Sequence, residues 1–381
     1  MAVNQWYVDP VDGNDTTGNG TSDATAWKTI QKVLTSFTQN TSDGDIINLK
    51  SNGTHTLTAN LNWSGVTYWV VHPLCFRGYD STAQDGGVAT VELDGYTFIN
   101  NSTANFMKFK DLKFKNTGTG SGTLFTVGFD LFMDNCTFED FDTGGSTNSV
   151  IKQGTGTNEK FVFTNCTFTN INGYAIRSLG PQVFVSGCHF YNSGSKTINS
   201  AVYIDGTEKP VLTHNIFNLS STSDAITGSI SAQGMHIAYN TFFTSGTGDA
   251  IVHSTNNYSA VVDNNIFEGW NKAVDFGNAN NYMGTSVSNN HFYDNTTDID
   301  TTTNRTFMIQ DGNFLSAGSS VLSKSGSNTH ANRFTYFEPT GDAVGGASDG
   351  NSDIGAVKAA SGGGGSSSIL RMPGMTGGMN G

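Results

Sequence analysis

The sequence predicts an all-β fold, a solenoid of stacked parallel strands. A four-residue phrase, x-[Cys/Asn]-x-Phe, recurs along the chain, and its last four phenylalanines are each 25 residues apart. Repeats of about 20–50 residues are typical of stacked architectures. The segments between phrases are short apolar runs broken by Gly, Asn, Ser, Thr and Asp, which favours strands and turns over helices. The phrase occupies 135–138, 165–168, 187–190, 214–217, 239–242, 264–267 and 289–292.

Each repeat has room for three short strands. About 25 residues, at roughly 3.3 Å per residue, allow three strands and three bends. Stacking such coils about 4.8 Å apart gives a parallel β-helix, in which each coil contacts only its neighbours. We place this solenoid at residues 46–357.

One column of the predicted solenoid lies two residues before each phenylalanine. Stacked asparagine amides can bond one another and the turn backbone, so the column predicts an internal ladder, with a polar site as the alternative. Its three cysteines are expected as buried thiols, although adjacent coils would also bring their Cα atoms within the range of a disulfide. The column comprises Leu112, Cys136, Cys166, Cys188, Asn215, Asn240, Asn265 and Asn290.

The N-terminal residues 1–45 are predicted to cap the first coil, because an open strand edge invites aggregation. Trp27, Ile30 and Val33 place apolar groups on one face of a helix at about 24–37. Asp23 or Thr25 could cap the start of this helix.

Residues 358–381 change in composition and form a separate C-terminal segment. Its Gly/Ser-rich part, 361–368, is typical of a flexible linker. The rest is either a disordered terminus or a docking peptide that orders on a partner, with methionines filling an adaptable groove. The attachment candidates are Ile369, Leu370, Arg371, Met372, Met375 and Met379.

Charge and composition exclude several function classes. The formal net charge is −13, and only 13% of residues are charged. Nucleic-acid binding needs a basic patch, so we expect neither nucleic-acid nor anionic-membrane partners. No stretch approaches the roughly 20 apolar residues of a membrane span. The N-terminus shows no charged and apolar leader, so we expect a cytoplasmic protein, a mature fragment, or a virion protein assembled in the host cytoplasm and released by lysis.

Three features of the sequence indicate a family resemblance. They are the phenylalanine phrases, the N-terminal stretches 6–15 and 24–33, and the C-terminal phrase 352–357. The chain resembles the right-handed parallel β-helix proteins of the pectate-lyase-like superfamily, over roughly 45–357. The resemblance implies a right-handed solenoid whose last coil is closed by 352–357. It does not fix an activity, because lyases, hydrolases, adhesins and viral spikes share this fold.

A second phrase in each coil supplies candidate carboxylates. Asp224 and Asp249 each fall seven residues after a phrase phenylalanine, so coils in register would bring them about 5 Å apart. Such a pair could bind Ca²⁺ or act as a general acid and its partner, and Lys272 could instead neutralise it. Alternatively, each Asp caps a turn at the start of its strand.

The resemblance also bears on catalysis. Pectate lyases of the superfamily use a Ca²⁺-binding acidic cluster and an arginine base. Arg177 is the only arginine between Arg77 and Arg305, and no cluster of three carboxylates surrounds it in the repeats. We therefore assign no catalytic residue, and keep Asp224, Asp249 and Arg177 as the alternative. The histidines at 214, 236, 253 and 291 fall at different coil positions and are expected as surface or ladder residues.

Two functions fit these features. The first is a structural or recognition protein of a phage particle, as capsid decoration, fibre or tail spike, because the chain resembles phage-borne β-helices. That resemblance implies a homotrimer. Contact with other virion proteins through the C-terminal segment is our hypothesis. The alternative is a polysaccharide lyase or glycoside hydrolase acting in a groove of the solenoid. No cofactor is expected other than Ca²⁺. Aromatic candidates for glycan contact are Tyr203, Tyr258, Trp270 and Tyr282.

Overall fold

The computed structural model divides the chain into two compact units, one ending at residue 180 and one beginning at residue 181. It describes residues 3–40, 42–63, 73–100, 106–118, 124–127, 130–142, 148–153, 160–180, 182–192, 196, 198–206, 209–220, 222–228, 234–253, 259–276, 285–300, 308–313, 319–324, 337–340 and 355–356.

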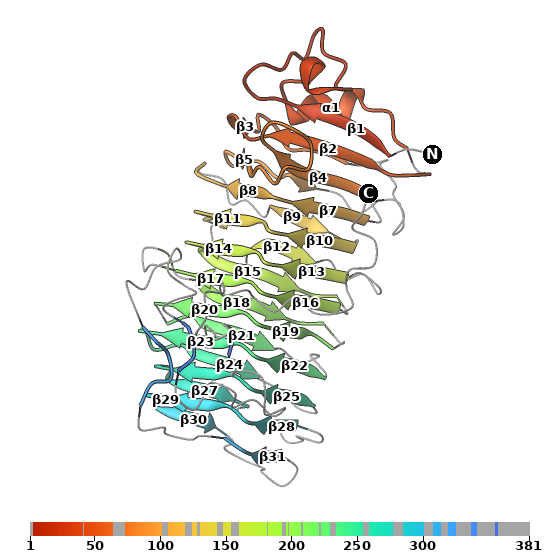
Figure 1. Cartoon of the computed structure of the whole chain (residues 1–381). Coiled ribbons are helices and arrows are strands. Elements are labelled where there is room, and N and C mark those ends of the chain that lie inside the picture. Colours follow the sequence, from red (N-terminus) through yellow and green to blue (C-terminus); the bar gives the residue numbers. More distant parts are fainter. Residues whose placement is uncertain are drawn as a thin grey trace, which may run out of the picture. The chain divides into compact units, whose positions relative to one another are not determined.

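The first unit contains three parallel sheets, and the chain visits them in turn (Figure 1). The first sheet contains β1 (Asn4–Val8), β2 (Asp45–Lys50), β4 (Leu74–Tyr79), β7 (Phe106–Lys110), β10 (Asp130–Asp134) and β13 (Lys160–Thr164). The second contains β3 (Thr54–Thr56), β5 (Ala89–Glu92), β8 (Leu112–Lys115), β11 (Thr137–Glu139) and β14 (Thr167–Thr169). The third contains β6 (Ile99–Asn100), β9 (Phe125–Val127), β12 (Ser149–Gln153) and β15 (Gly173–Ser178).

The second unit repeats this arrangement. Its first sheet contains β16 (Gln182–Ser186), β19 (Val211–Thr213), β22 (Met235–Ala238), β25 (Ala260–Asp263), β28 (Thr285–Ser288) and β31 (Met308–Asp311). Its second contains β17 (His189–Tyr191), β20 (Ile216–Leu219), β23 (Thr241–Thr244), β26 (Ile266–Glu268) and β29 (His291–Tyr293). Its third contains β18 (Ile198–Ile204), β21 (Asp224–Gly228), β24 (Asp249–His253), β27 (Lys272–Asp275) and β30 (Thr297–Asp300). The fold is a right-handed parallel β-helix, as predicted.

The phenylalanines of the repeated phrase form an interior row. Phe217 pairs in register with Phe242, and the row continues through Phe267 to Phe292. The ring centroids of successive phenylalanines are 4.7–5.0 Å apart, and the rings are nearly parallel. These side chains are fully buried. The stacking predicted from the 25-residue period is therefore confirmed.

The asparagine ladder is also present. Asn240 Nδ2 donates to the Leu212 carbonyl at 2.9 Å and to Asn265 Oδ1 at 3.0 Å, and Asn240 Oδ1 accepts from the Asn215 backbone N–H. Asn265 repeats this pattern toward Asn290. Cys136, Cys166 and Cys188 are buried thiols in the same column. Each asparagine side chain thus satisfies buried polar groups of its own coil and of a neighbouring coil.

The residue just before the ladder position makes the bend between the first and second sheets. In the second unit its φ is positive in every coil, between 54° and 66°. This left-handed conformation favours Gly and Asn, which explains their recurrence at the first position of the phrase. The row comprises Gly187, His214, Tyr239, Asn264, Asn289 and Gly312.

The N-terminal helix is shorter than predicted. Helix α1 spans Ile30–Ser36, preceded by the short 3-10 helix η1 (Asp23–Thr25). Its N-cap is Thr29, which accepts from the Lys32 N–H and donates to Asp15 Oδ2, not Asp23 or Thr25 as predicted. The difference arises because Asp15 also binds the backbone N–H of Lys28, which holds that residue outside the helix. Among the described residues, no helix is long and apolar enough to cross a membrane.

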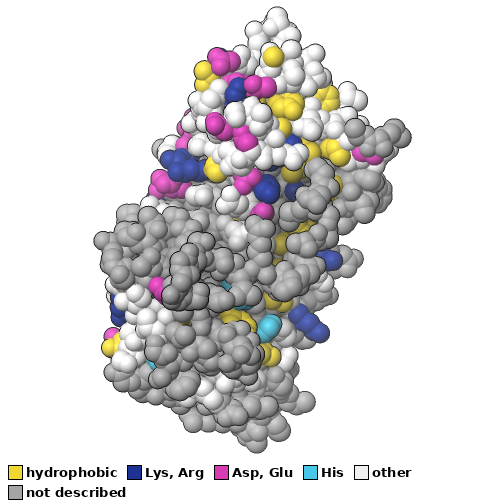
Figure 2. Space-filling view, viewed as in Figure 1, with side chains coloured by type: hydrophobic (Ala, Val, Ile, Leu, Met, Phe, Trp, Pro, Cys, Tyr) yellow, Lys and Arg dark blue, Asp and Glu magenta, His cyan; other side chains and the backbone are white. Residues whose placement is uncertain are grey.

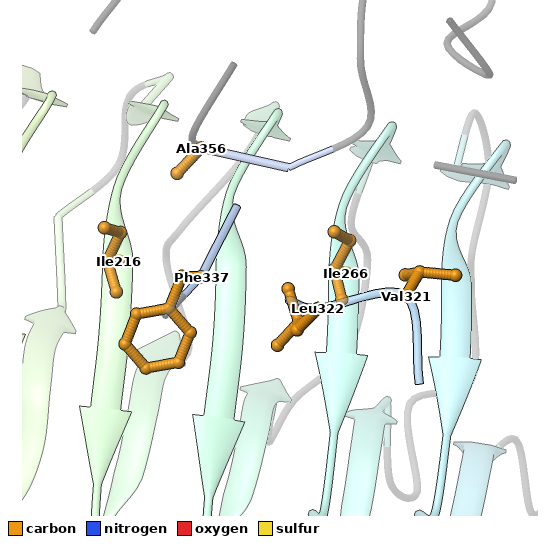
Figure 3. Packing of buried hydrophobic residues seen from close by; sticks show 6 residues of the cluster. All are labelled: Ile216, Ile266, Val321, Leu322, Phe337 and Ala356. Carbon is orange, nitrogen blue, oxygen red and sulfur yellow. The ribbon is translucent and has the colours of Figure 1, made fainter. Parts of the chain in front are cut away.

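C-terminal segments cover the outer side of the second sheet in the second unit. Val321, Leu322, Phe337 and Ala356 pack against Ile216 and Ile266, which point outward from β20 and β26 (Figure 3). We call these described segments, 319–324, 337–340 and 355–356, the cover. Gly355 N–H donates to the Asn264 carbonyl, and Ala356 N–H donates to Thr241 Oγ1. The two described residues of 352–357 therefore lie against inner coils, and not at the last coil as the resemblance implied.

Candidate functional site

The third sheet of the second unit carries the predicted carboxylate pair. Asp224 begins β21 and Asp249 begins β24, and the pairing of Ile226 with Ile251 sets the two aspartates opposite each other. Adjacent parallel strands place such residues about 5 Å apart. Their spacing in the sequence was therefore sufficient to predict that the two aspartates lie on adjacent strands in register.

Both carboxylates bind the next coil. Asp224 Oδ1 accepts from the Asp249 backbone N–H at 3.1 Å. Asp249 Oδ1 accepts from the Lys272 backbone N–H and from Asn271 Nδ2, both at 2.9 Å. Each aspartate thus ties the start of its strand to the start of the following one. These bonds run to the next coil, whereas the turn-capping interpretation placed them within the turn at the start of each aspartate's own strand.

Burial raises the pKa of Asp224 to about 6. The charge of Asp249 adds to this increase in pKa, and the charge of Asp275 adds further. The hydrogen bonds from the Asp249 N–H and from Thr227 Oγ1 oppose it, because they stabilise the ionised carboxylate. Asp224 therefore exchanges a proton near neutral pH, which an ordinary aspartate does not do.

Lys272 does not neutralise the predicted pair. Its Nζ contacts Asp275 Oδ2 on its own strand at 2.7 Å and Asp300 Oδ2 on the next coil at 2.8 Å. These two carboxylates raise the pKa of Lys272 through hydrogen bonds and charge. Asp275 and Asp300 were not among the predicted site residues, because they end their strands, whereas the predicted aspartates begin theirs. Their spacing of 25 residues was the available signal.

A second outward row runs along the same sheet. In register it contains Tyr203, Thr227, Val252, Asp275 and Asp300. The side chain of Tyr203 is partly exposed on β18. One aromatic candidate thus lies on the same sheet as the carboxylates.

Of the other aromatic candidates, only Trp270 lies among the described residues. Trp270 is only 1% exposed, so its ring offers no surface for a sugar, and we correct its assignment as a contact residue. It is buried because it follows β26 and turns into the interior, where its backbone N–H donates to Asn295 Oδ1. Tyr258 and Tyr282 lie outside the described residues, as do the attachment candidates at 369–379.

Arg177 belongs to the first unit, whereas the aspartate pair belongs to the second. It lies on β15 in register with Lys152, and its guanidinium carbon is 5.9 Å from the centre of the Tyr174 ring. No described group of three or more His, Cys, Asp or Glu side chains is arranged to hold a metal ion. The Asp224–Asp249 pair offers two carboxylates, whereas Ca²⁺ takes six to eight oxygen ligands.

Charges in the first unit are interspersed. Glu139 pairs with both Lys113 and Lys115 on the second sheet. Figure 2 shows acidic and basic side chains side by side over the N-terminal strands, with no large region of one sign on the face in view.

Comparisons with known proteins extend this description. No protein-family model and no curated protein matches the chain. Among solved structures, it is similar to a GH136 lacto-N-biosidase from Eubacterium ramulus, at 11% identity and a TM-score of 0.39, over 81% of this chain and 67% of that one. It is also similar to pectate lyase Pel9A, at 15% identity and a TM-score of 0.43, over 94% and 97% of the two chains.

A third solved structure is a mannuronic acid specific polysaccharide family 6 lyase from human gut microbiota. The likeness has 14% identity and a TM-score of 0.45, over 88% of this chain and 73% of that one. At identities of 11–15%, these likenesses are limited to the fold and give no information on activity or substrate.

Proposed function

We propose that this protein is a non-catalytic recognition protein whose β-helix presents its third sheet to a glycan. The main support is that the candidate acids form hydrogen bonds between adjacent coils. Asp224 accepts from the Asp249 N–H, and Asp249 accepts from the Lys272 N–H. A carboxylate held in this way is a fixed acceptor for a sugar hydroxyl, since its two oxygens together have more lone pairs than these hydrogen bonds use. Lys272 is held between Asp275 and Asp300 and is equally fixed.

The outward row supports a linear ligand. Its side chains repeat at the spacing of the coils, so a polymer lying along the sheet meets one of them in each coil. Tyr203 offers an aromatic face at one end of the row, and Asp300 offers an acceptor at the other. Rigid, preorganised groups lower the entropic cost of binding.

Two assays with a surface polysaccharide of the host cell test this proposal together: one measures binding, and the other measures cleavage. We expect the protein to bind, and to release no reducing ends and no product absorbing at 232 nm. Tyr203→Ala should weaken binding about tenfold, which corresponds to the loss of one aromatic contact. Thr297→Ala, on the same sheet, is the matched control and should bind like the wild type. Turnover that disappears in the Asp224→Asn/Asp249→Asn double variant would overturn the proposal.

One observation favours a second function, glycoside hydrolysis. A general acid works best with a pKa near the working pH, and the pKa of Asp224 is about 6. Two carboxyl groups about 5 Å apart have the separation that retaining glycosidases use. Under this alternative Asp224 is the acid and Asp249 is the nucleophile, and the turnover assay above decides between the two functions.

We propose a phage particle as the place where this protein acts. The support comes from the sequence, since the rigid solenoid is followed by a Gly/Ser-rich linker and a methionine-rich segment. In this proposal, residues 369–379 bind another virion protein. Deleting residues 359–381 should release the protein from purified particles, and a truncated protein that stays on particles would refute the attachment.

A further inference from the structure

Three outward side chains of the second unit surround one ammonium group. Phe243, Glu268 and Tyr293 are paired in register on β23, β26 and β29, so they lie side by side on the second sheet. The Lys324 Nζ contacts Glu268 Oε1, and it lies 5.9 Å from the centre of the Phe243 ring and 5.7 Å from the centre of the Tyr293 ring. We call Phe243, Glu268 and Tyr293 the cage.

The cage has the chemistry of a cation site. Ser320 Oγ donates to Glu268 Oε2 at 2.6 Å, which leaves Oε1 to accept from the ammonium. The faces of aromatic rings attract a cation, and more strongly where water is excluded. A carboxylate in the same site favours a primary ammonium over a quaternary one, because a quaternary nitrogen has no hydrogen to donate.

The cation reaches this buried carboxylate from the surface. The Lys324 side chain is 36% exposed, whereas the Glu268 side chain is 4% exposed. The alkyl stem of the lysine thus runs from solvent to the carboxylate. An amine on a short alkyl stem has the same route open to it when Lys324 withdraws.

Lys324 is held by its contacts, since its backbone is in an unfavourable conformation. Its φ is 49°, and it is the only Lys or Arg among the described residues with positive φ. A long side chain rarely adopts this left-handed conformation, which persists only where surrounding contacts hold it.

The segment that carries Lys324 is joined to the rest of the cover and not to the strands. Ser323 N–H donates to the Glu338 carbonyl, and Thr340 N–H donates to the Val321 carbonyl. No described backbone hydrogen bond joins residues 319–324 to a strand. Lys324 can therefore leave the cage without breaking a sheet.

We propose that the cage is a binding site for a primary ammonium group, and that Lys324 is its exchangeable occupant. The ligand class is a primary amine on an alkyl stem, which competes with Lys324 for Glu268. When such a ligand binds, residues 319–324 lose their charged contact with the sheet. The inference is independent of the proposed glycan recognition, because no residue of the cage belongs to the third sheet.

Lys324→Gly tests this inference, because it empties the cage while glycine suits the left-handed backbone. We expect n-butylammonium, which reproduces the lysine side chain, to bind the variant and raise its melting temperature by about 3 °C at saturation. The proton resonances of the amine should move upfield in NMR spectra, since it lies over two ring faces. Tetramethylammonium should bind about tenfold more weakly, because it donates no hydrogen bond to Glu268. The wild type should also bind n-butylammonium about tenfold more weakly than the variant, because Lys324 competes.

Two further variants serve as controls. Lys324→Gly/Glu268→Gln keeps the rings but removes the carboxylate, and should lose the binding of n-butylammonium. Lys115→Ala opens a lysine–glutamate pair in the first unit, where the Glu139 side chain is 26% exposed and more accessible to water. This variant should gain no stability from the amine.

Several results would overturn the inference. One is a gain in melting temperature that is equal in Lys324→Gly and Lys115→Ala, or equal with tetramethylammonium, because it would reflect a nonspecific effect of the salt. Another is the absence of both the gain and the upfield shifts in Lys324→Gly. Wild-type binding as tight as that of the variant would show that Lys324 does not compete for the site. If Lys324→Gly is unfolded on its own, circular dichroism compares its folded fraction with and without n-butylammonium, and no increase counts against the site.

Discussion

At the scale of single residues, the asparagine ladder limits which side chains the second unit tolerates at the ladder position. Asn240 is fully buried and serves three coils through its amide. An asparagine here cannot be exchanged for an apolar residue of similar size, because its partners are backbone groups that remain in place. Removing one partner of a buried hydrogen bond costs more than the bond contributes on average.

We therefore expect Asn240→Ala to lower the free energy of unfolding by about 3 kcal/mol, since it leaves several buried backbone groups unpaired. Urea unfolding monitored by circular dichroism measures this loss. Thr58→Ala, at an exposed position, is the control and should change the free energy by less than about 0.5 kcal/mol. A loss below about 1 kcal/mol for Asn240→Ala would show that water replaces the amide.

The pKa of Asp224 predicts a pH dependence. Its folded-state pKa is about 6, above the usual 3.8. The folded state thus holds this proton more tightly, so the contribution to stability is complete below about pH 4 and is lost as the pH rises through 6. Asp224→Asn keeps an oxygen for the Asp249 N–H and removes the charge. We expect wild-type stability to fall by about 2 kcal/mol more than that of the variant between pH 4 and pH 7. Equal slopes in urea unfolding would contradict this expectation.

At the scale of elements, the cover depends on a buried acid. Glu268, on β26, is 3% exposed and pairs with Lys324 of the cover, and Ser320 Oγ donates to its second oxygen at 2.6 Å. The Lys324 ammonium also lies over the rings of Phe243 and Tyr293. A single cation therefore compensates the Glu268 charge and packs on two rings of the sheet.

We expect Lys324→Met to destabilise the protein by about 3 kcal/mol, because it leaves a buried carboxylate without its cation. The Glu268→Gln/Lys324→Met double variant should recover most of this loss, since the charge itself is gone. Thermal and urea unfolding of the single and double variants measure the recovery. If both variants lose the same amount, the packing of the Lys324 stem, and not its charge, holds the cover.

At the scale of the whole molecule, the cover decides whether an apolar sheet face meets water. Ile216, Ile266 and Phe243 point outward from the second sheet of the second unit and are covered by segments from the last 70 residues of the chain. Gly355 approaches so closely that a Cβ there would lie 2.8 Å from Ile266 Cδ1, and its φ of 99° favours glycine. An exposed apolar face of this kind promotes association.

We expect deletion of residues 314–381 to yield a protein that binds a hydrophobic dye and aggregates, because the outer face of β20, β23 and β26 loses its cover. Deletion of residues 358–381 is the matched control and should leave solubility and melting temperature unchanged. Light scattering and dye fluorescence compare the two truncations. A soluble, dye-negative protein ending at residue 313 would show that the cover is dispensable for the solenoid.

Four features could be predicted from the sequence: the repeat, the stacking of the phenylalanines, the asparagine ladder and the register of Asp224 with Asp249. These features depend on residues one coil apart, and a fixed period converts directly into contact between adjacent strands. Other features could be established only from the structure. Trp270 is buried, the N-terminal helix is shorter than predicted, and Gly355 and Ala356 lie over inner coils. These outcomes depend on where bends direct a side chain and on contacts across many coils, which have no period in the sequence.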